Sequence, residues 1–251
     1  MPTQEIAIAL TDVDKRFGGL RAVKNVSMEV RAGERVSMIG TNGAGKSTLF
    51  NLIAGVFPVS AGSVSMFGSV VTKQNTAKRA RNGLARTFQT SRLFEQLTAE
   101  ENVFIALGGR GLGWQSLFPA RRIPRKWNRV AELLTTVGLG SEGERRVADL
   151  SHGEQRQLEL AMALAADPKI LMLDEPAAGF SPAERQQLVK MLTTLPAEIT
   201  LLLIEHDMDI ALQVADRVIV MHDGSKILEG TPDEIRASQV VRDIYLGGGH
   251  A

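Results

Sequence analysis

The sequence predicts an α/β fold built around a parallel sheet. Two nearly continuous apolar runs, KILMLDEP (169–176) and ITLLLIEH (199–206), are typical of strands that are buried on both faces. The segment between them, SPAERQQLVKMLTTL (181–195), has the length and pattern of the crossover helix that parallel neighbours require. A third apolar run, RVSMIG (35–40), leads through a glycine-rich turn into a helix, KSTLFNLIAG (46–55).

Further strands are expected on both sides of these elements. IAIAL (6–10) and NVSMEV (25–30) show the partial alternation of a half-buried strand, and AGSVSMFG (61–68) is expected to form a strand between turns. In DRVIVMHDGSKILEG (216–230), two strand-like runs flank Asp223-Gly224, which is a typical dipeptide of a tight hairpin turn. The sequence therefore predicts β-structure at both ends of the chain.

The middle of the chain is predicted to be helical. TAEENVFIAL (98–107) and WNRVAELLTTVGL (127–139) have helical periodicity, and the segment between them (108–127) mixes Gly, Pro and Arg and is expected to be an exposed loop. Its basic cluster is interpreted as a solvated face, with contact to a partner or to lipid headgroups as the alternative. In the crossover helix, Ser181 is the expected N-cap and Pro182 the first helical residue.

Composition excludes several classes of protein. The chain has 251 residues, of which 44% are hydrophobic, and this is enough for one well-filled domain. The 29 basic and 28 acidic residues give a net charge of +1, so nothing in the charge indicates nucleic-acid binding. Without cysteine there is no disulfide framework, thiol nucleophile or Cys-ligated metal. No signal-peptide layout and no 18-residue apolar stretch is present, so a cytoplasmic protein is expected.

The glycine-rich turn has the pattern of a phosphate-binding loop. GTNGAGKST (40–48) matches G-x-x-x-x-G-K-[ST] between a strand and a helix, whereas a chance glycine-rich turn needs no such context. Backbone N–H groups and the helix dipole would bind phosphate oxygens. We expect Lys46 to reach the β- and γ-phosphates and Ser47 to ligate Mg²⁺. The other residues expected at the nucleotide are Asn42, Gly43, Ala44, Gly45 and Thr48.

Two adjacent carboxylates follow the buried run at 169–176. Asp174 is the candidate Mg²⁺ ligand, and Glu175 is the candidate base that accepts a proton from the attacking water. The alternative is that both carboxylates only cap the next helix. The predicted reaction is in-line attack of water on the γ-phosphate of ATP, with the developing charge stabilised by Lys46, Mg²⁺ and backbone N–H groups.

Four motifs in the order GTNGAGKST, LSHGEQ, LMLDEP and LIEHD make the chain similar to an ABC-type ATPase subunit over nearly its whole length. This resemblance implies a P-loop NTPase fold with a mixed sheet core and an N-terminal antiparallel β portion. It also implies a helical subdomain inserted before the signature motif. The whole chain, 1–251, would be one ATP-binding domain, with its core at about 1–89 and 166–251 and the helical subdomain at about 90–165.

The resemblance also assigns single residues. Phe17 stands where the family has an aromatic residue that stacks on adenine, and Val23 falls in the same nucleotide pocket. Gln89 matches the loop glutamine that meets Mg²⁺ and signals to the membrane partner, and His206 matches the catalytic switch histidine. The alternatives are a core role for Phe17 and a structural role for His206.

LSHGEQ matches the family signature, in which Ser151, His152, Gly153 and Glu154 would bind the ATP that is held by a second subunit. The resemblance therefore implies a homodimer, or a heterodimer with a related ATPase subunit, around two ATP molecules. Two departures stand out: His152 replaces the usual glycine, and Ser181 replaces a frequent aspartate. They leave open the geometry across the dimer interface.

KRFGGLRAVKNVSMEV, RTFQTSRLFEQLTAEENV and the ending VRDIYLGGG are similar to the ATP-binding subunits of branched-chain amino acid importers. Such a subunit would lie on the cytoplasmic face of the inner membrane, with two integral-membrane permeases and a periplasmic or extracellular substrate-binding protein. No residue of this chain would contact the transported substrate. The alternatives are the ATPase of a lipopolysaccharide-type exporter, an ABC ATPase of DNA repair or translation, and a nucleotide-binding module without turnover.

Overall fold

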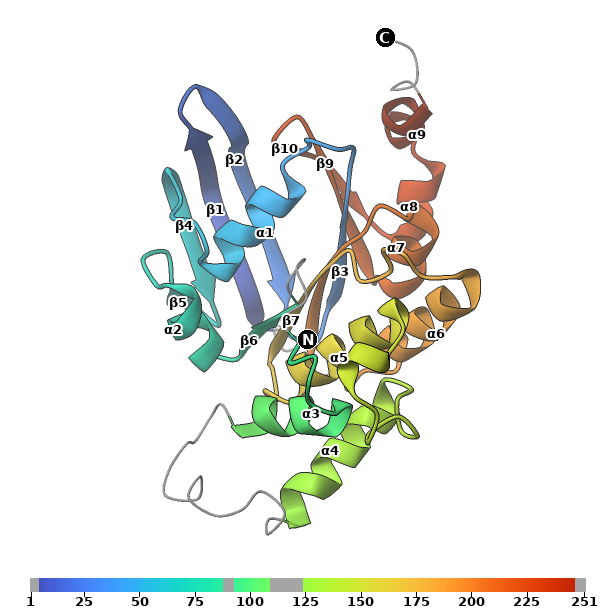
Figure 1. Cartoon of the computed structure of the whole chain (residues 1–251). Helices are drawn as coiled ribbons and strands as arrows, with labels where there is room; N and C mark the ends of the chain where they lie inside the picture. Colours follow the sequence, from blue (N-terminus) through green and yellow to red (C-terminus); the bar gives the residue numbers. More distant parts are fainter. Residues whose placement is uncertain (1–4, 88–92, 109–123, 247–251) are drawn as a thin grey trace.

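A six-stranded sheet forms the centre of the described part of the chain, residues 5–87, 93–108 and 124–246, in a computed structural model (Figure 1). The strand order is β10-β9-β3-β8-β7-β6, and all neighbours are parallel except the β9–β10 pair. The predicted parallel core is therefore confirmed. Its strands are β3 (Arg35–Ile39), β6 (Leu84–Arg86), β7 (Ile170–Asp174), β8 (Thr200–Ile204), β9 (Arg217–His222) and β10 (Ser225–Gly230).

A second, antiparallel sheet is formed by the N-terminal strands in the order β2-β1-β4-β5. Its members are β1 (Ile6–Phe17), β2 (Leu20–Arg31), β4 (Ala61–Met66) and β5 (Ser69–Val70). Helix α1 (Lys46–Ala54) lies between the two sheets, and its Leu49, Phe50 and Ile53 are fully buried in a core to which both sheets contribute. The N-terminal antiparallel portion is thus confirmed.

Local signals explain where the core helices begin and end. Helix α1 ends at Gly55, whose φ of 75° lies in the left-handed region that favours glycine. Helix α6 (Pro182–Thr193) begins with the capping box expected from its sequence, in which Ser181 and Glu184 bind each other's backbone N–H. The remaining helices of this part are α2 (Thr76–Arg81), α7 (Met208–Val214), α8 (Pro232–Ala237) and α9 (Gln239–Leu246).

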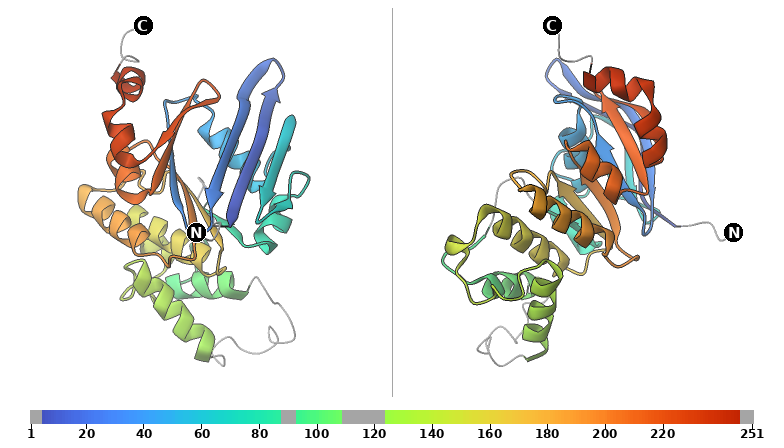
Figure 2. Two further views of the ribbon diagram at one scale, coloured as in Figure 1. Left: turned by 180° about the vertical axis from the view of Figure 1, so that it is seen from behind. Right: turned by 90° about the vertical axis from the view of Figure 1, so that its right-hand side faces the viewer.

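Three helices gather at one end of the sheet, while α8 and α9 lie at the opposite end (Figure 2). The three helices at the first end are α3 (Ala99–Gly108), α4 (Pro124–Thr136) and α5 (His152–Leu164). A 3-10 turn at Val147–Asp149 precedes α5. The loop predicted over residues 108–127 extends too far along the chain, because α4 already begins at Pro124. Trp127 in its first turn stacks on Phe104 of α3, with ring centroids 4.7 Å apart. The basic segment at 109–123 lies outside the described residues.

A buried arginine, Arg79 of α2, fixes the C-terminal end of α1. Only 1% of it is exposed, and burial lowers the pKa of its guanidinium. The guanidinium forms no ion pair with a carboxylate of the described residues. Instead it donates to the backbone carbonyls of Leu52, Ile53, Val71, Thr72 and Gln74. Two of these carbonyls belong to the last turn of α1, where a positive charge is favoured by the helix dipole.

Replacing Arg79 by Met is expected to lower the free energy of unfolding by about 3 kcal/mol or more, because several buried carbonyls lose their donor. The loss is measured by urea unfolding at 25 °C. Arg81→Met is the matched control, since Arg81 is exposed on the same helix and should change stability by less than about 0.5 kcal/mol. Equal losses in the two variants would contradict the role of Arg79.

Candidate nucleotide-binding site

The loop between β3 and α1 is shaped by two glycines that no other residue could replace. Gly40 has a φ of 150°, and a Cβ there would lie 2.1 Å from the carbonyl oxygen of Met221. Gly45 has a φ of 94°, and its Cβ would lie 2.5 Å from the carbonyl oxygen of Ala22. The loop therefore packs closely against β9 and β2, and its backbone is free to turn toward a ligand.

Lys46 is buried at the start of α1, and its ammonium group is held by the loop itself. Its Nζ donates to the carbonyls of Gly40, at 2.6 Å, and Thr41, at 3.0 Å. Burial lowers the pKa of Lys46, while the carboxylates of Glu175 and Asp174 act in the opposite direction. A buried ammonium held by neutral carbonyls, at the N-terminus of a helix, is well suited to bind an anion.

A cavity of about 530 Å³ opens beside this loop. It brings together the loop, the β1–β2 hairpin, the two candidate catalytic side chains and the β9–β10 turn. Its lining residues are Leu20, Arg21, Ala22, Asn42, Gly43, Ala44, Gly45, Lys46, Ser47, Thr48, Glu175, His206, Asp223 and Gly224. All loop residues expected at the nucleotide therefore line one cavity.

Two residues expected at the nucleotide base do not line it. Val23 is fully buried in the core, because strand alternation turns it inward, and the neighbouring Ala22 lines the cavity instead. Phe17 lies at the end of β1, is 42% exposed, and makes an edge contact with Phe57 at 5.5 Å between ring centroids. Phe17 is thus not a core aromatic, and its stacking on adenine stays a prediction. Gln89 lies outside the described residues.

Asp174 ends β7 and is almost fully buried. Its Oδ2 accepts from Nη2 of Arg86 at 3.3 Å, whereas its Oδ1 has no hydrogen-bond partner among the described residues. Burial raises the pKa of Asp174, and the charge of Arg86 opposes this shift. An unpaired carboxylate oxygen at a buried strand end fits a hard cation or one of its water ligands. The donor set of Asp174 and Ser47 is therefore compatible with Mg²⁺.

Glu175 and His206 form a close pair at the ends of β7 and β8. Oε1 of Glu175 lies 2.5 Å from Nε2 of His206. Glu175 has a φ of 51°, a left-handed conformation that is uncommon for a non-glycine residue. Such strain is often found at functional sites, where the surrounding structure maintains it. Here it turns the carboxylate out of the strand direction and toward the imidazole.

The signature residues lie apart from this cavity. Ser151 is the N-cap of α5 and forms a capping box with Glu154. Gly153 packs so closely on α6 that a Cβ there would lie 2.1 Å from Oε1 of Glu184. The ring of His152 lies beside Gly179, in the loop that follows Glu175. None of these residues is among the described residues that line the phosphate cavity, so the signature motif and the phosphate loop lie apart in one chain.

Sequence reasoning missed several residues at this edge of the sheet. Arg86 bridges Asn51 of α1 and Asp174 of β7, and packs on the ring of Phe50. Asp223 and Gly224 were recognised only as a turn, yet they line the phosphate cavity. The signal that could have found Arg86 is its place three residues before Gln89. Nothing in the local sequence indicates the role of the turn.

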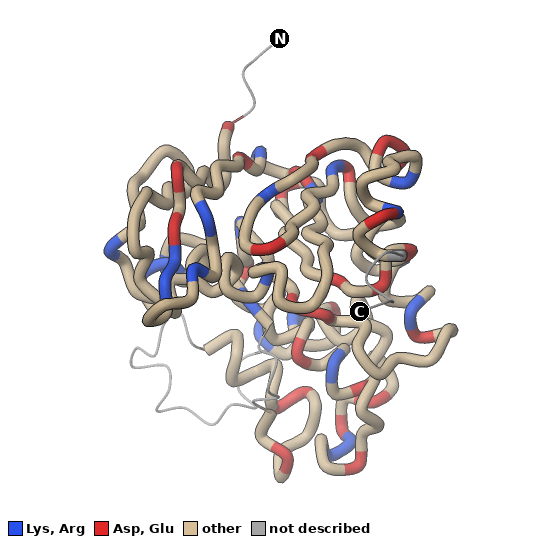
Figure 3. Tube along the Cα trace, turned by 90° about the horizontal axis from the view of Figure 1, so that it is seen from above, with Lys and Arg blue, Asp and Glu red and all other residues tan. Residues whose placement is uncertain are grey.

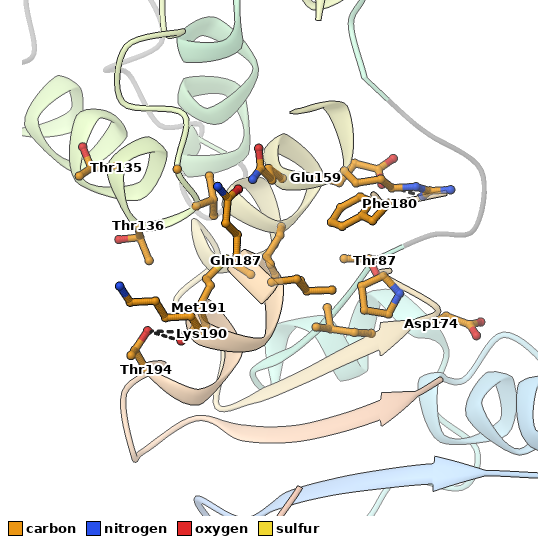
Figure 4. A pocket seen from close by; sticks show the side chains of 18 residues that line it. Thr87, Thr135, Thr136, Glu159, Asp174, Phe180, Gln187, Lys190, Met191 and Thr194 are labelled. Carbon is orange, nitrogen blue, oxygen red and sulfur yellow. Dashed lines mark hydrogen bonds and ion pairs between the residues drawn. The ribbon is translucent and has the colours of Figure 1, made fainter. Parts of the chain in front are cut away.

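A second cavity, of about 340 Å³, lies between the helical end of the molecule and the sheet (Figure 4). Thr135 and Thr136 of α4 and Glu159 of α5 face Gln187 and Lys190 of α6 across it, and Asp174 lies at its edge. The cavity therefore leaves unfilled space beside the contact between the helical end and the core.

These features are typical of an ATPase: a glycine-rich phosphate loop with its lysine, a buried carboxylate with an unpaired oxygen, a Glu–His pair, and a second helix N-terminus without a lysine. The chain belongs to the ABC transporter family of ATP-binding cassettes, whose family model matches residues 23–178. It is an ATPase subunit of that family. Residues 225–251 match a second model, described as the branched-chain amino acid ATP-binding cassette transporter.

Its relatives and structural neighbours agree with this assignment. The chain is 39% identical to the high-affinity branched-chain amino acid transport ATP-binding proteins BraF of Pseudomonas aeruginosa and LivG of Salmonella typhimurium. Each comparison covers 96% of this chain and 97% of the relative. The cassette MJ1267 in its ADP conformation matches with a TM-score of 0.82 and 31% identity, over 96% of this chain and 99% of MJ1267. The dimeric cassette MJ0796 bound to ADP and Pi matches with a TM-score of 0.78 and 25% identity, over 90% and 98%.

Within the described residues, no helix is long and apolar enough to cross a membrane. Lys, Arg, Asp and Glu are interspersed along the chain in the view from above (Figure 3).

Proposed function

We propose that this chain hydrolyses MgATP to power the uptake of branched-chain amino acids or related amides through separate permease subunits. The identity to BraF and LivG and the match at residues 225–251 support this substrate class. Its complex would contain two integral-membrane permeases and a periplasmic or extracellular substrate-binding protein. The chain would be peripheral, on the cytoplasmic face of the inner membrane, and would bind no nucleic acid.

In the proposed reaction, the side chains that line the phosphate cavity act together with Asp174, Gln89 and Phe17. Lys46 and the loop N–H groups bind the β- and γ-phosphates. Ser47, Asp174 and Gln89 would hold Mg²⁺, which would supply charge stabilisation when bound. Glu175 accepts the proton of the attacking water. His206 contacts Glu175 at 2.5 Å and orients it. Phe17 stacks on the adenine ring.

The observation that carries this proposal is the separation of two half-sites on one chain. The phosphate cavity contains Lys46 but no residue of α5, within the part of the chain that the structure describes. The N-terminus of α5, with Ser151 and Gly153, has a capped helix end but no lysine. Two copies of this chain, or this chain and a related subunit, would form a dimer in which each subunit completes the other's site around two ATP molecules. This dimer would act as a clamp that ATP holds closed and that hydrolysis reopens.

We further propose that the helical region, at about 90–165, moves relative to the core at about 1–89 and 166–251 when the clamp closes. The cavity between α5 and α6 leaves room for this motion. A permease segment would bind in a separate, mainly apolar cavity of about 540 Å³ between α2, β6, α3 and α5. Thr87 and Leu93, which flank the segment with Gln89, line that cavity.

The test is to purify the tagged chain from membranes in mild detergent and to identify its partners by mass spectrometry. We expect two permeases and a substrate-binding protein. In reconstituted vesicles, ATPase activity should rise when the binding protein carries a branched-chain amino acid. The permeases of an exporter, ribosomes or DNA in place of these partners would refute the proposal.

A further inference from the structure

Beside the site lies Glu205, a buried carboxyl group that has no role in the proposed reaction. It follows β8 directly, precedes His206, and is 3% exposed. Its Oε1 accepts from the backbone N–H of Ala177 at 3.0 Å. Among the described residues, no Lys or Arg forms an ion pair with it. A buried carboxyl group without a cation is costly to keep, which points to a specific use.

The backbone that Glu205 binds is the strained turn after β7. Glu175, with its φ of 51°, donates its own N–H to the carbonyl of Ile204 at 2.9 Å. Pro176 has no N–H to donate. Ala177 is therefore the next residue that can tie the turn to β8, and its buried N–H binds the Glu205 side chain. Without Glu205 this donor would have no partner in the structure.

Glu205 thus joins the two segments that carry the catalytic pair. Its side chain binds the N–H that lies two residues after Glu175, and its backbone directly precedes His206. We propose that Glu205 is a positioning residue for ATP hydrolysis, which holds the turn at Glu175 and the end of β8 at the spacing that keeps Glu175 against His206. This inference rests on the roles proposed above for Glu175 and His206.

This role requires a hydrogen-bond acceptor oxygen rather than a negative charge. Burial raises the pKa of Glu205 to about 7, against the smaller effect of the Ala177 N–H. The protonated and the ionised carboxyl group both keep an acceptor oxygen, so the bond to the Ala177 N–H does not require the charge. A glutamine, which has the same length and an amide oxygen, should accept the same hydrogen bond.

The test compares the steady-state ATPase kinetics of four variants with the wild type. Glu205→Met removes the acceptor at similar volume, and Glu205→Asp keeps the carboxyl group but shortens it by one methylene. We expect both to lower kcat about 10- to 100-fold, with KM for MgATP within about twofold of wild type, because misplacing a reacting group affects the chemical step. Glu205→Gln should retain at least about half of the wild-type kcat.

Thr200→Val is the matched control. Thr200 is the first residue of β8, is fully buried, and accepts from the backbone N–H of Gly33 at 3.1 Å. Its replacement removes the same kind of bond from the opposite end of the same strand, so it should lower the unfolding midpoint and leave kcat unchanged. If Glu205→Met does not fold, Glu205→Asp carries the comparison.

Four results would overturn the proposal: wild-type kcat in the Met and Asp variants, a Gln variant as slow as Met, a KM that rises as much as kcat falls, or an equal loss of kcat in Thr200→Val. The catalytic scheme itself is tested separately with Glu175→Gln. Normal turnover by that variant refutes the base assignment, whereas normal turnover by the Glu205 variants alone refutes only the positioning role.

Discussion

Glu175→Gln is expected to bind MgATP with wild-type affinity and to hydrolyse it about 10²- to 10⁴-fold more slowly. An amide cannot accept the proton of the attacking water, and general-base catalysis contributes a factor of this size. The substitution keeps the length of the side chain, so the close contact with His206 and the left-handed turn at Glu175 can persist. Single-turnover hydrolysis of radiolabelled ATP measures the chemical step directly.

Because this variant traps ATP, it should also accumulate a dimer on a sizing column when MgATP is present. The wild type, treated in the same way, should return to the monomer as ATP is consumed. Wild-type turnover by Glu175→Gln would remove Glu175 from the role of base. Slow turnover without any dimer would leave the base assignment standing but contradict the clamp.

Ser151→Arg is expected to lower hydrolysis by about 10²-fold or more, while ATP binding to the monomer stays close to wild type. In the proposed dimer, Ser151 contacts the γ-phosphate held by the other subunit, and losing such a donor and blocking its position removes transition-state stabilisation. Ser151 lines no part of the cavity around Lys46 within the described residues, so binding in cis should be unaffected. Filter binding at low protein concentration measures the monomer.

The control for Ser151→Arg must account for the helix cap. Ser151 caps α5 through a capping box with Glu154, and losing such a cap costs about 1 kcal/mol. Thr231 caps α8 through the same arrangement with Glu234, away from the phosphate cavity. Thr231→Arg should therefore cost similar stability and keep its ATPase activity. Loss of ATP binding by the Ser151→Arg monomer would refute the trans site.

The central sheet could be predicted because two of its strands can be recognised from their own apolar sequence. The runs at 169–176 and 199–206 are apolar without interruption, and the structure places both inside a parallel sheet as β7 and β8. β6 (Leu84–Arg86) was missed because three residues give no periodicity to detect. The start of α4 was placed three residues too late, because its first turn contains proline and two basic residues that look like loop.

The candidate site was predictable where its chemistry lies within one short motif. Lys46, Ser47 and the loop around them, together with Glu175 and His206, line one cavity in the structure. Val23 does not line this cavity, because its orientation depends on the register of β2 against the core, and its contact with the nucleotide stays a prediction. Arg86 and Glu205 were not found, since their partners lie 88 and 28 residues away along the chain.

The sequence by itself determined the phosphate loop, the two carboxylates, the signature helix and the family, because each of these depends on residues that are close neighbours in the chain. Only the tertiary structure decided how they meet. The carboxyl ends of parallel strands lie at one edge of a sheet, so β3, β7 and β8 bring Lys46, Glu175 and His206 together from distant positions. The same packing buries Glu205 and separates Ser151 from the loop, because burial and distance are properties of the folded chain.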